Sequence, residues 1–231
     1  MKTYNIAIDG PAGAGKSTIA RLAAKELGFV YVDTGAMYRA LALFFLRKGI
    51  SPEDISGIRA ALPEAEVTLH YEGGEQVVLL NGENVNGLIR TEEVGKMASV
   101  TSPVPAVREK LRELQWKLAR EADVIMDGRD IGTEVLPDAD LKIYLTADVS
   151  IRAERRYREL VERGETCDRD ELEREIAERD RQDMSRAVSP LKRADDAVLL
   201  DGSLLTIEQT RDEILRLFRE RREKTGDARQ A

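Results

Sequence analysis

A glycine-rich octet close to the N-terminal end of the sequence constrains the fold more than any other feature. Residues 10–17 read Gly-Pro-Ala-Gly-Ala-Gly-Lys-Ser and fit the pattern G-x-x-x-x-G-K-[ST]. A short apolar stretch over residues 5–9 precedes the octet, and a helix-forming run over residues 18–24 follows it. Strand, octet and helix together predict a phosphate-binding loop, whereas a turn that only caps a helix would not require all three.

The spacing of this octet has a physical basis. Gly10, Gly13 and Gly15 allow the backbone to wrap closely around a ligand, because glycine adopts positive φ angles without steric cost. Successive N–H groups at a helix N-terminus then form a cradle for phosphate. Lys16 would bring a positive charge to the terminal phosphates, and the Ser17 hydroxyl would be a ligand of Mg²⁺. The octet therefore predicts a nucleoside triphosphate site that uses Mg²⁺.

Four further segments have the character of the strand before the octet. They cover residues 29–32, 124–127, 141–145 and 197–201, and helical segments separate them. They are apolar without clean alternation, which is typical of strands that are covered on both faces. We therefore expect an α/β fold with three layers and a five-stranded parallel sheet. Acidic residues close several of these strands at the carboxyl edge, where such sheets bind ligands: Asp9, Asp33, Asp127 and Asp201.

Charge and composition disfavour several classes of function. The 43 acidic and 36 basic residues give a net charge of −7, which disfavours non-specific binding to nucleic acid or to an anionic membrane. The single cysteine, Cys167, excludes an internal disulfide and a multi-cysteine zinc site. The sequence has neither a signal-peptide pattern nor an apolar run of about 18 residues, so we expect a cytoplasmic protein. An acidic protein that binds phosphates must also gather its arginines locally.

An antiparallel segment interrupts the α/β pattern. Residues 34–62 are predicted to be helical, with a turn at Ser51-Pro52. Residues 66–71 and 76–80 then alternate around a glycine turn, which predicts a β-hairpin. A helix over residues 104–120 returns the chain to the next strand. We interpret the hairpin as a small insertion within one domain that spans the chain.

The arginines that phosphate binding requires occur in two consecutive helices. In the first, over residues 150–165, Arg152, Arg155 and Arg156 recur at offsets that share one helical face. We expect at least two of them to contact phosphates of the bound nucleotide, although a solvated helix face is the alternative. The last helix, over residues 206–224, precedes Gly226 and a polar tail that we expect to be frayed.

The second arginine helix, over residues 169–185, carries a more compact group. Arg179, Asp183 and Arg186 follow one another at offsets of four and seven, which places them within about 60° around the helix axis. The alternative for the first two is an exposed ion pair worth a few tenths of a kcal/mol. Two arginine faces on a chain of this size favour a small phosphotransferase. A GTPase would need the base-reading motif N-K-x-D, which does not occur.

Three further motifs make a family resemblance specific. They are residues 33–39 (Asp-Thr-Gly-Ala-Met-Tyr-Arg), 127–133 (Asp-Gly-Arg-Asp-Ile-Gly-Thr) and 179–187 (Arg-Asp-Arg-Gln-Asp-Met-Ser-Arg-Ala). In this order, and with the octet and the hairpin, they resemble bacterial cytidylate kinases over nearly the whole chain. The resemblance implies a P-loop kinase with a monophosphate-binding insertion at residues 34–102 and a mobile arginine-rich lid at 148–172. It also implies phosphate transfer from ATP to CMP or dCMP.

The resemblance further implies roles for single residues on the acceptor side. Residues that match Arg39, Arg129 and Arg186 bind the phosphate of the acceptor in that family. The residues that match Arg179 and Asp183 face its sugar and phosphate. On the donor side, we expect ATP to be bound by the octet, the residue after it and the arginines of residues 150–165: Gly10, Pro11, Ala12, Gly13, Ala14, Gly15, Lys16, Ser17, Thr18, Arg152, Arg155 and Arg156.

The base of the acceptor would be read by a separate group. The resemblance assigns it to Ser99, Arg108 and Asp130, with Asp130 accepting a hydrogen bond from the exocyclic amine of cytosine. An aspartate in this place would disfavour the carbonyl of uracil. Tyr38 and Thr34 complete the expected acceptor site. The family often has serine where Thr34 stands, and the hydroxyl is retained.

The expected chemistry requires no general base. The acceptor is a phosphate monoester that is largely dianionic near pH 7, because its second pKa is about 6. The single histidine, His70, is therefore predicted to be structural. Catalysis would depend on alignment and on charge neutralisation by Lys16, Arg129 and Arg186. Asp127 ends its strand as a Walker-B acid does and would hold Mg²⁺ through water, although a capping role is the alternative.

Two rival functions follow from the same residues. The nearer one is a P-loop kinase for another small acceptor, such as UMP. The farther one is a non-catalytic module whose shape is switched by nucleotide, which the acceptor-side arginines disfavour. The expected partners are ATP and CMP or dCMP, without nucleic acid or membrane, and we expect a monomer.

Overall fold

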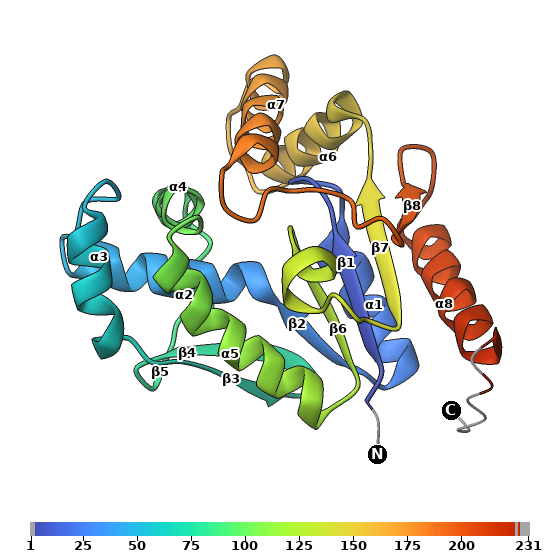
Figure 1. The fold of residues 1–231 in the computed structure, drawn as a ribbon. Coiled ribbons are helices and arrows are strands. Elements are labelled where there is room, and N and C mark those ends of the chain that lie inside the picture. Colours follow the sequence, from blue (N-terminus) through green and yellow to red (C-terminus); the bar gives the residue numbers. More distant parts are fainter. Residues whose placement is uncertain (1–2, 225, 227–231) are drawn as a thin grey trace.

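A five-stranded parallel sheet forms the centre of the computed structural model, which describes residues 3–224 and 226 (Figure 1). Its strands lie in the order β2-β6-β1-β7-β8, and all neighbouring pairs are parallel. This confirms the expected α/β fold. The bounds of the strands are β1 (Asn5–Asp9), β2 (Val30–Asp33), β6 (Val124–Gly128), β7 (Leu141–Thr146) and β8 (Val198–Asp201).

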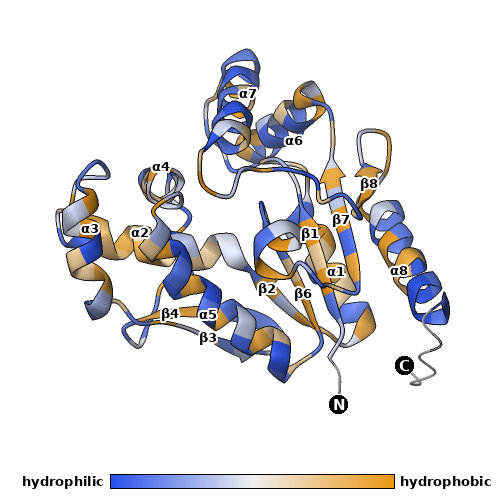
Figure 2. Ribbon diagram, in the orientation of Figure 1, coloured by the Kyte–Doolittle hydropathy of each residue, from blue (hydrophilic) through white to orange (hydrophobic). Residues whose placement is uncertain are grey.

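The sheet is buried on both faces, as its apolar strands predicted. Ile6 and Ile8 of β1 belong to a core on the side of α1 (Lys16–Leu27) and α8 (Ile207–Lys224). Ala7 belongs to a second core on the opposite side, because successive side chains of a strand point to opposite faces. Two helices supply that second side, α2 (Thr34–Arg47) and α5 (Pro105–Glu121). Figure 2 shows the central strands as largely hydrophobic.

The predicted hairpin is present in a second, antiparallel sheet beside β2 (Figure 1). Its strands are β3 (Val67–Glu72), β4 (Glu75–Leu80) and β5 (Glu83–Asn84), and α3 (Ile55–Ala61) precedes them after the expected turn. The two-residue strand β5 and the helix α4 (Glu92–Thr101) were not predicted. A strand as short as β5 has no periodicity to detect, and Gly95, inside a ten-residue helix, weakens the helical signal of α4.

The two arginine-bearing helices lie together at the carboxyl edge of the sheet (Figure 1). They are α6 (Val149–Glu162) and α7 (Arg169–Ser185), and α7 is largely hydrophilic in Figure 2. Between β6 and β7 the chain makes a π-helical turn, Ile131–Val135. Among the described residues, no helix is both long and apolar enough to cross a membrane. The polar tail after Gly226, for which we expected fraying, lies outside the described residues.

Candidate active site

The phosphate loop forms where the octet predicted it, between the end of β1 and the start of α1. Gly10, Gly13 and Gly15 have φ angles of 153°, 73° and 86°. A Cβ atom on Gly10 would lie 1.9 Å from the carbonyl oxygen of Leu145 on β7, so only glycine fits there. The loop therefore lies directly against the sheet, and α1 begins at Lys16 with its N-terminus toward the loop.

Lys16 is buried inside this loop. Its Nζ donates a 2.7 Å hydrogen bond to the carbonyl oxygen of Pro11. Burial lowers the pKa of Lys16, and the positive charge of Arg129 lowers it further. A bound polyphosphate would reverse this effect, because negative charge close to an ammonium group favours its protonated form.

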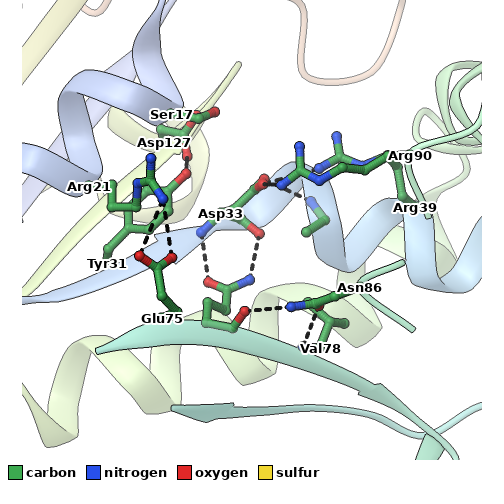
Figure 3. A network of polar contacts seen from close by, with 12 residues as sticks. Ser17, Arg21, Tyr31, Asp33, Arg39, Glu75, Val78, Asn86, Arg90 and Asp127 are labelled. Carbon is green, nitrogen blue, oxygen red and sulfur yellow. Dashed lines mark hydrogen bonds and ion pairs between the residues drawn. The ribbon is translucent and has the colours of Figure 1, made fainter. Parts of the chain in front are cut away.

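A carboxylate and two hydroxyl groups meet beside the start of α1 (Figure 3). The Ser17 Oγ donates a 2.8 Å hydrogen bond to Oδ2 of Asp127, and the Tyr31 hydroxyl donates a 2.9 Å hydrogen bond to Oδ1. Burial raises the pKa of Asp127, and the neighbouring Asp33 carboxylate raises it further. The pair of Ser17 and Asp127 offers the hard oxygen atoms that Mg²⁺ prefers.

This pair fits a hydrated Mg²⁺ better than a site made wholly of protein ligands. The described residues contain no group of three or more His, Cys, Asp or Glu side chains that could hold a metal. Mg²⁺ commonly keeps several waters and is bound by one or two protein groups together with substrate phosphates. The hydroxyl of Ser17 and the carboxylate of Asp127 satisfy that requirement without a third acid.

Arginines approach the site from α2, from the end of β6 and from α7. Arg39 forms a 3.1 Å ion pair with Asp33, and Arg129 forms a 2.8 Å ion pair with Asp183. Burial lowers the pKa of Arg179, and the charges of Arg129 and Arg39 contribute to the same shift. The structure thus brings three predicted cations together, although like charges repel one another.

Two of the predicted phosphate ligands have unused hydrogen-bond donors. Within the part of the chain that the structure describes, Nε of Arg39 and Nη2 of Arg186 are buried without a hydrogen-bond partner. Arg186 also lies 3.9 Å from carboxylate oxygens of Asp130 and of Asp183. A buried donor without a hydrogen-bond partner is costly, so each of these guanidinium groups is suited to an anion that accepts from it.

The residues expected to read the base form a second buried group. Arg108 forms a close ion pair with Asp130, and its guanidinium lies 5.7 Å from the centre of the Tyr38 ring. Burial raises the pKa of Asp130, whereas Arg108 lowers it. Among the described contacts, Ser99 is linked to this group indirectly. Its carbonyl accepts from Ser102, and the carbonyl of Ser102 accepts from Arg108.

The three arginines of α6 have different surroundings. Arg152 is buried and donates a 2.8 Å hydrogen bond to the carbonyl oxygen of Ala12 in the phosphate loop. Its Nη2 also forms a 2.6 Å ion pair with Asp180 of α7. Arg155 donates to the carbonyl oxygen of Gly202, and Arg156 pairs with Glu159 of its own helix. Among the described contacts, Arg152 alone of the three reaches the loop.

Several residues that organise the site were not predicted to do so. Thr34 donates a 2.7 Å hydrogen bond to the carbonyl oxygen of Asp127. Both residues were predicted to belong to the site, but this contact between them was not. Tyr31, Gln76 and Arg90 were not predicted. Gln76 exchanges hydrogen bonds with the backbone N–H and carbonyl of Asp33, and Arg90 lies 3.9 Å from its carboxylate (Figure 3). These partners are distant in sequence, so no local spacing reveals them.

A phosphate loop after the first strand of a parallel sheet faces a second set of arginines, and this combination defines a P-loop phosphotransferase. The comparison with known proteins narrows the class. The sequence matches the cytidylate kinase family over residues 6–220, and the chain belongs to that family.

Individual relatives agree with this assignment. A cytidylate kinase from Caldicellulosiruptor saccharolyticus is 50% identical over 218 residues, which cover 94% of this chain and 96% of that protein. A cytidylate kinase from Listeria monocytogenes is 50% identical over 217 residues, with the same coverage of 94% and 96%. A crystal structure of an uncharacterized protein from Eubacterium ventriosum matches with a TM-score of 0.51 at 13% identity. The match covers 95% of this chain and 99% of that chain, and it supports the fold alone.

Proposed function

We propose that this protein transfers the γ-phosphoryl group of ATP to CMP or dCMP, with ADP and CDP or dCDP as products. Membership of the cytidylate kinase family supports this reaction. The observation that carries it is the second cationic site, where Arg39 and Arg186 have buried donors without partners among the described residues. A module that used nucleotide only as a switch would need no second phosphate site.

We assign the donor nucleotide to the loop and to the start of α1. Its phosphates would be bound by the backbone of the loop and by Lys16, with the lid at residues 148–172 above them. The contact of Arg152 with Ala12 supports a role for α6 at the donor phosphates. Arg155 and Arg156 would first have to exchange their present partners for ATP. The proposed donor ligands are Gly10, Pro11, Ala12, Gly13, Ala14, Gly15, Lys16, Ser17, Thr18, Arg152, Arg155 and Arg156.

The metal ion would be bound at the start of α1. We propose that the Ser17 hydroxyl is a direct ligand of Mg²⁺ and that Asp127 holds one of its waters. The 2.8 Å hydrogen bond between these two side chains supports the pairing. When bound, Mg²⁺ neutralises negative charge on the transferring phosphoryl group.

The phosphate of the acceptor would be bound across from the loop. We propose that Arg39, Arg129 and Arg186 bind it, and that Arg179 and Asp183 face the sugar and phosphate. Planar guanidinium groups bind phosphate oxygens in pairs, which fixes orientation as well as charge. The ion pairs with acidic side chains support this assignment, because they hold the arginines ready when no phosphate is bound.

The cytosine would be read beyond this phosphate site, by residues of the insertion at residues 34–102, of α5 and of the segment after β6. We propose that Asp130 accepts from the exocyclic amine and that Arg108 and Ser99 assist. Tyr38 and Thr34 line the same site. The position of the Arg108 guanidinium over the Tyr38 ring and against Asp130 supports a common binding surface for the base.

Phosphoryl transfer then requires alignment rather than a base. The acceptor oxygen is already anionic near pH 7, so no side chain has to remove a proton from it. Lys16, Arg129 and Arg186 would neutralise charge as the two nucleotides approach each other in line. Closure of the lid would exclude water, which otherwise competes as the acceptor.

A panel of nucleoside monophosphates tests this proposal directly. Each monophosphate is supplied with ATP and Mg²⁺, and ADP release is measured. The proposal expects turnover with CMP and dCMP and much weaker turnover with UMP, AMP and GMP. Faster turnover with UMP would identify the nearer rival function, and ATP binding without turnover on any monophosphate would favour the switch.

We also propose that the protein acts as a monomer in the cytoplasm, without nucleic-acid or membrane partners. The net charge of −7 and the single cysteine support this proposal. Light scattering during size-exclusion chromatography measures the oligomeric state, and a dimer mass would contradict it.

A further inference from the structure

Asp9 links the phosphate loop to the turn that carries the proposed base-reading residue. It is the last residue of β1, directly before Gly10, and its side chain is buried. Its Oδ1 accepts a 2.8 Å hydrogen bond from the N–H of Ile131, and its Oδ2 accepts a 2.7 Å hydrogen bond from the N–H of Gly132. These two residues follow Asp130 directly.

Asp130 occupies a position at which aspartate usually performs this task itself. It is the N-cap residue of the turn Ile131–Val135, and an N-cap aspartate commonly accepts from N–H groups of the first turn. Within the described residues, Asp130 makes no such capping bond. Its carboxylate instead pairs with Arg108, and Arg186 lies 3.9 Å away. The first N–H groups of the turn are bound by Asp9 instead.

We infer that Asp9 is a positioning residue, which caps this turn in place of Asp130 and so leaves the Asp130 carboxylate available to the cytosine. The inference depends on the proposed role of Asp130 in reading the base. Without Asp9, the N–H groups of Ile131 and Gly132 would lack acceptors in a buried place. Asp130 directly precedes these residues, so its carboxylate could rotate to accept hydrogen bonds from their N–H groups. It would then no longer be positioned to contact the cytosine.

Gly132 adapts the turn to this contact. A Cβ atom on Gly132 would lie 3.3 Å from Oδ2 of Asp9 and 3.3 Å from Cδ of Lys142, which is closer than side chains usually pack. Lys142 is itself held by a 2.8 Å ion pair with Asp196. A methyl group at residue 132 would therefore push the turn away from Asp9 without altering the phosphate loop.

The same contact joins the two halves of the active site. Asp9 is adjacent to the loop that would bind ATP, and the turn that it holds begins directly after Arg129 and Asp130. One carboxylate thus sets the distance between the donor loop and the acceptor residues. Its substitution should affect binding of the acceptor more than binding of the donor, because the two hydrogen bonds that its carboxylate accepts come from the acceptor-side turn.

Two variants test the inference from opposite sides of this contact. Asp9→Asn keeps the shape of the side chain but replaces one acceptor oxygen with a donor. Gly132→Ala displaces the turn and leaves Asp9 and the loop unchanged in sequence. For each variant, kcat/KM is measured with CMP and with UMP, and the affinity for a non-hydrolysable ATP analogue is measured by calorimetry. Asp201→Asn is the matched control, because this residue ends β8 at the same sheet edge and, among the described contacts, its side chain accepts hydrogen bonds only from Ser203.

The inference expects the preference for CMP over UMP to fall about tenfold in both variants, since a buried hydrogen bond is lost. The affinity of Gly132→Ala for the ATP analogue should stay within about twofold of wild type. An equal loss of turnover with CMP and UMP, with their ratio unchanged, would assign Asp9 a structural role only and reject the inference. Unfolding of both variants at the assay temperature would reject it for the same reason.

The proposed function fails in a different way. If the wild-type protein shows no preference for CMP over UMP, Asp130 does not read cytosine, whatever the two variants do. If the wild-type preference is present and Asp130→Ala removes it, but Asp9→Asn and Gly132→Ala retain it, only the inference about Asp9 is wrong.

Discussion

Ser17 and Asp127 are joined by a 2.8 Å hydrogen bond, which connects the start of α1 to the end of β6. Residues 110 positions apart in the sequence thus form one oxygen-rich pair beside the phosphate loop. The Tyr31 hydroxyl donates a hydrogen bond to the other carboxylate oxygen of Asp127, so the orientation of the carboxylate is fixed. The pair would lie between the two substrates, at the place where a hydrated metal ion is required.

Replacement of Asp127 by asparagine should therefore separate activity from stability. We expect kcat/KM to fall by about a hundredfold and more Mg²⁺ to be needed for half-maximal activity. The melting temperature should be unchanged or higher at pH 7. Burial raises the pKa of Asp127, so its ionised form costs free energy of folding at that pH. Kinetics over a Mg²⁺ titration and a thermal melt without ligands measure both effects. A lower melting temperature with unchanged Mg²⁺ dependence would contradict the metal assignment.

Lys16→Ala should abolish transfer while the protein remains folded. The ammonium group would neutralise the phosphates of ATP, and loss of such a charge costs about a thousandfold or more in kcat. Lys48→Ala is a suitable control, since Lys48 pairs with the exposed Glu64 away from the loop. Single-turnover assays with saturating ATP would measure the effect. If Lys16→Ala kept most of the wild-type rate, the loop would not hold the transferring phosphate.

The stability contributed by Asp9 should depend on pH. Burial raises the pKa of Asp9 from 3.8 to about 6, although the N–H groups of Gly132 and Ile131 lower it. A carboxyl group whose pKa is raised on folding binds its proton more tightly in the native state, so stability falls as pH rises from about 4 to about 6. Relative to Asp9→Asn, the free energy of unfolding of the wild type should increase by on the order of 3 kcal/mol when the pH is lowered from 7 to 4. Urea unfolding of both proteins at the two pH values measures this, and a constant difference would show that Asp9 has an ordinary pKa.

Much of this architecture was predictable because its signals are local. The octet, the strand before it and the helix after it lie within about twenty residues, and each is recognised from its own residues. The hairpin was also predictable from alternation around Gly73 and Gly74. The acids that end β1, β2 and β6 could be assigned to one sheet edge by topology alone.

The partners of these acids were not predictable. Asp33 ends β2 as expected, but its backbone is bound by Gln76 from the hairpin, 43 positions later in the chain. Asp9 contacts residues more than 120 positions away. Such contacts depend on how the insertion and the turn after β6 pack against the sheet. A single sequence contains no periodic signal for them.

The binding of CMP and of cytidine, compared by calorimetry in the wild type and in Arg129→Ala, tests the central claim most directly. That claim is that arginines opposite the phosphate loop hold the phosphate of the acceptor. We predict that the wild type binds CMP at least about a hundredfold more tightly than cytidine, because charge-assisted hydrogen bonds to phosphate are strong. Arg129→Ala should lose most of this advantage and bind cytidine as before. Equal affinities for CMP and cytidine in the wild type would contradict the account.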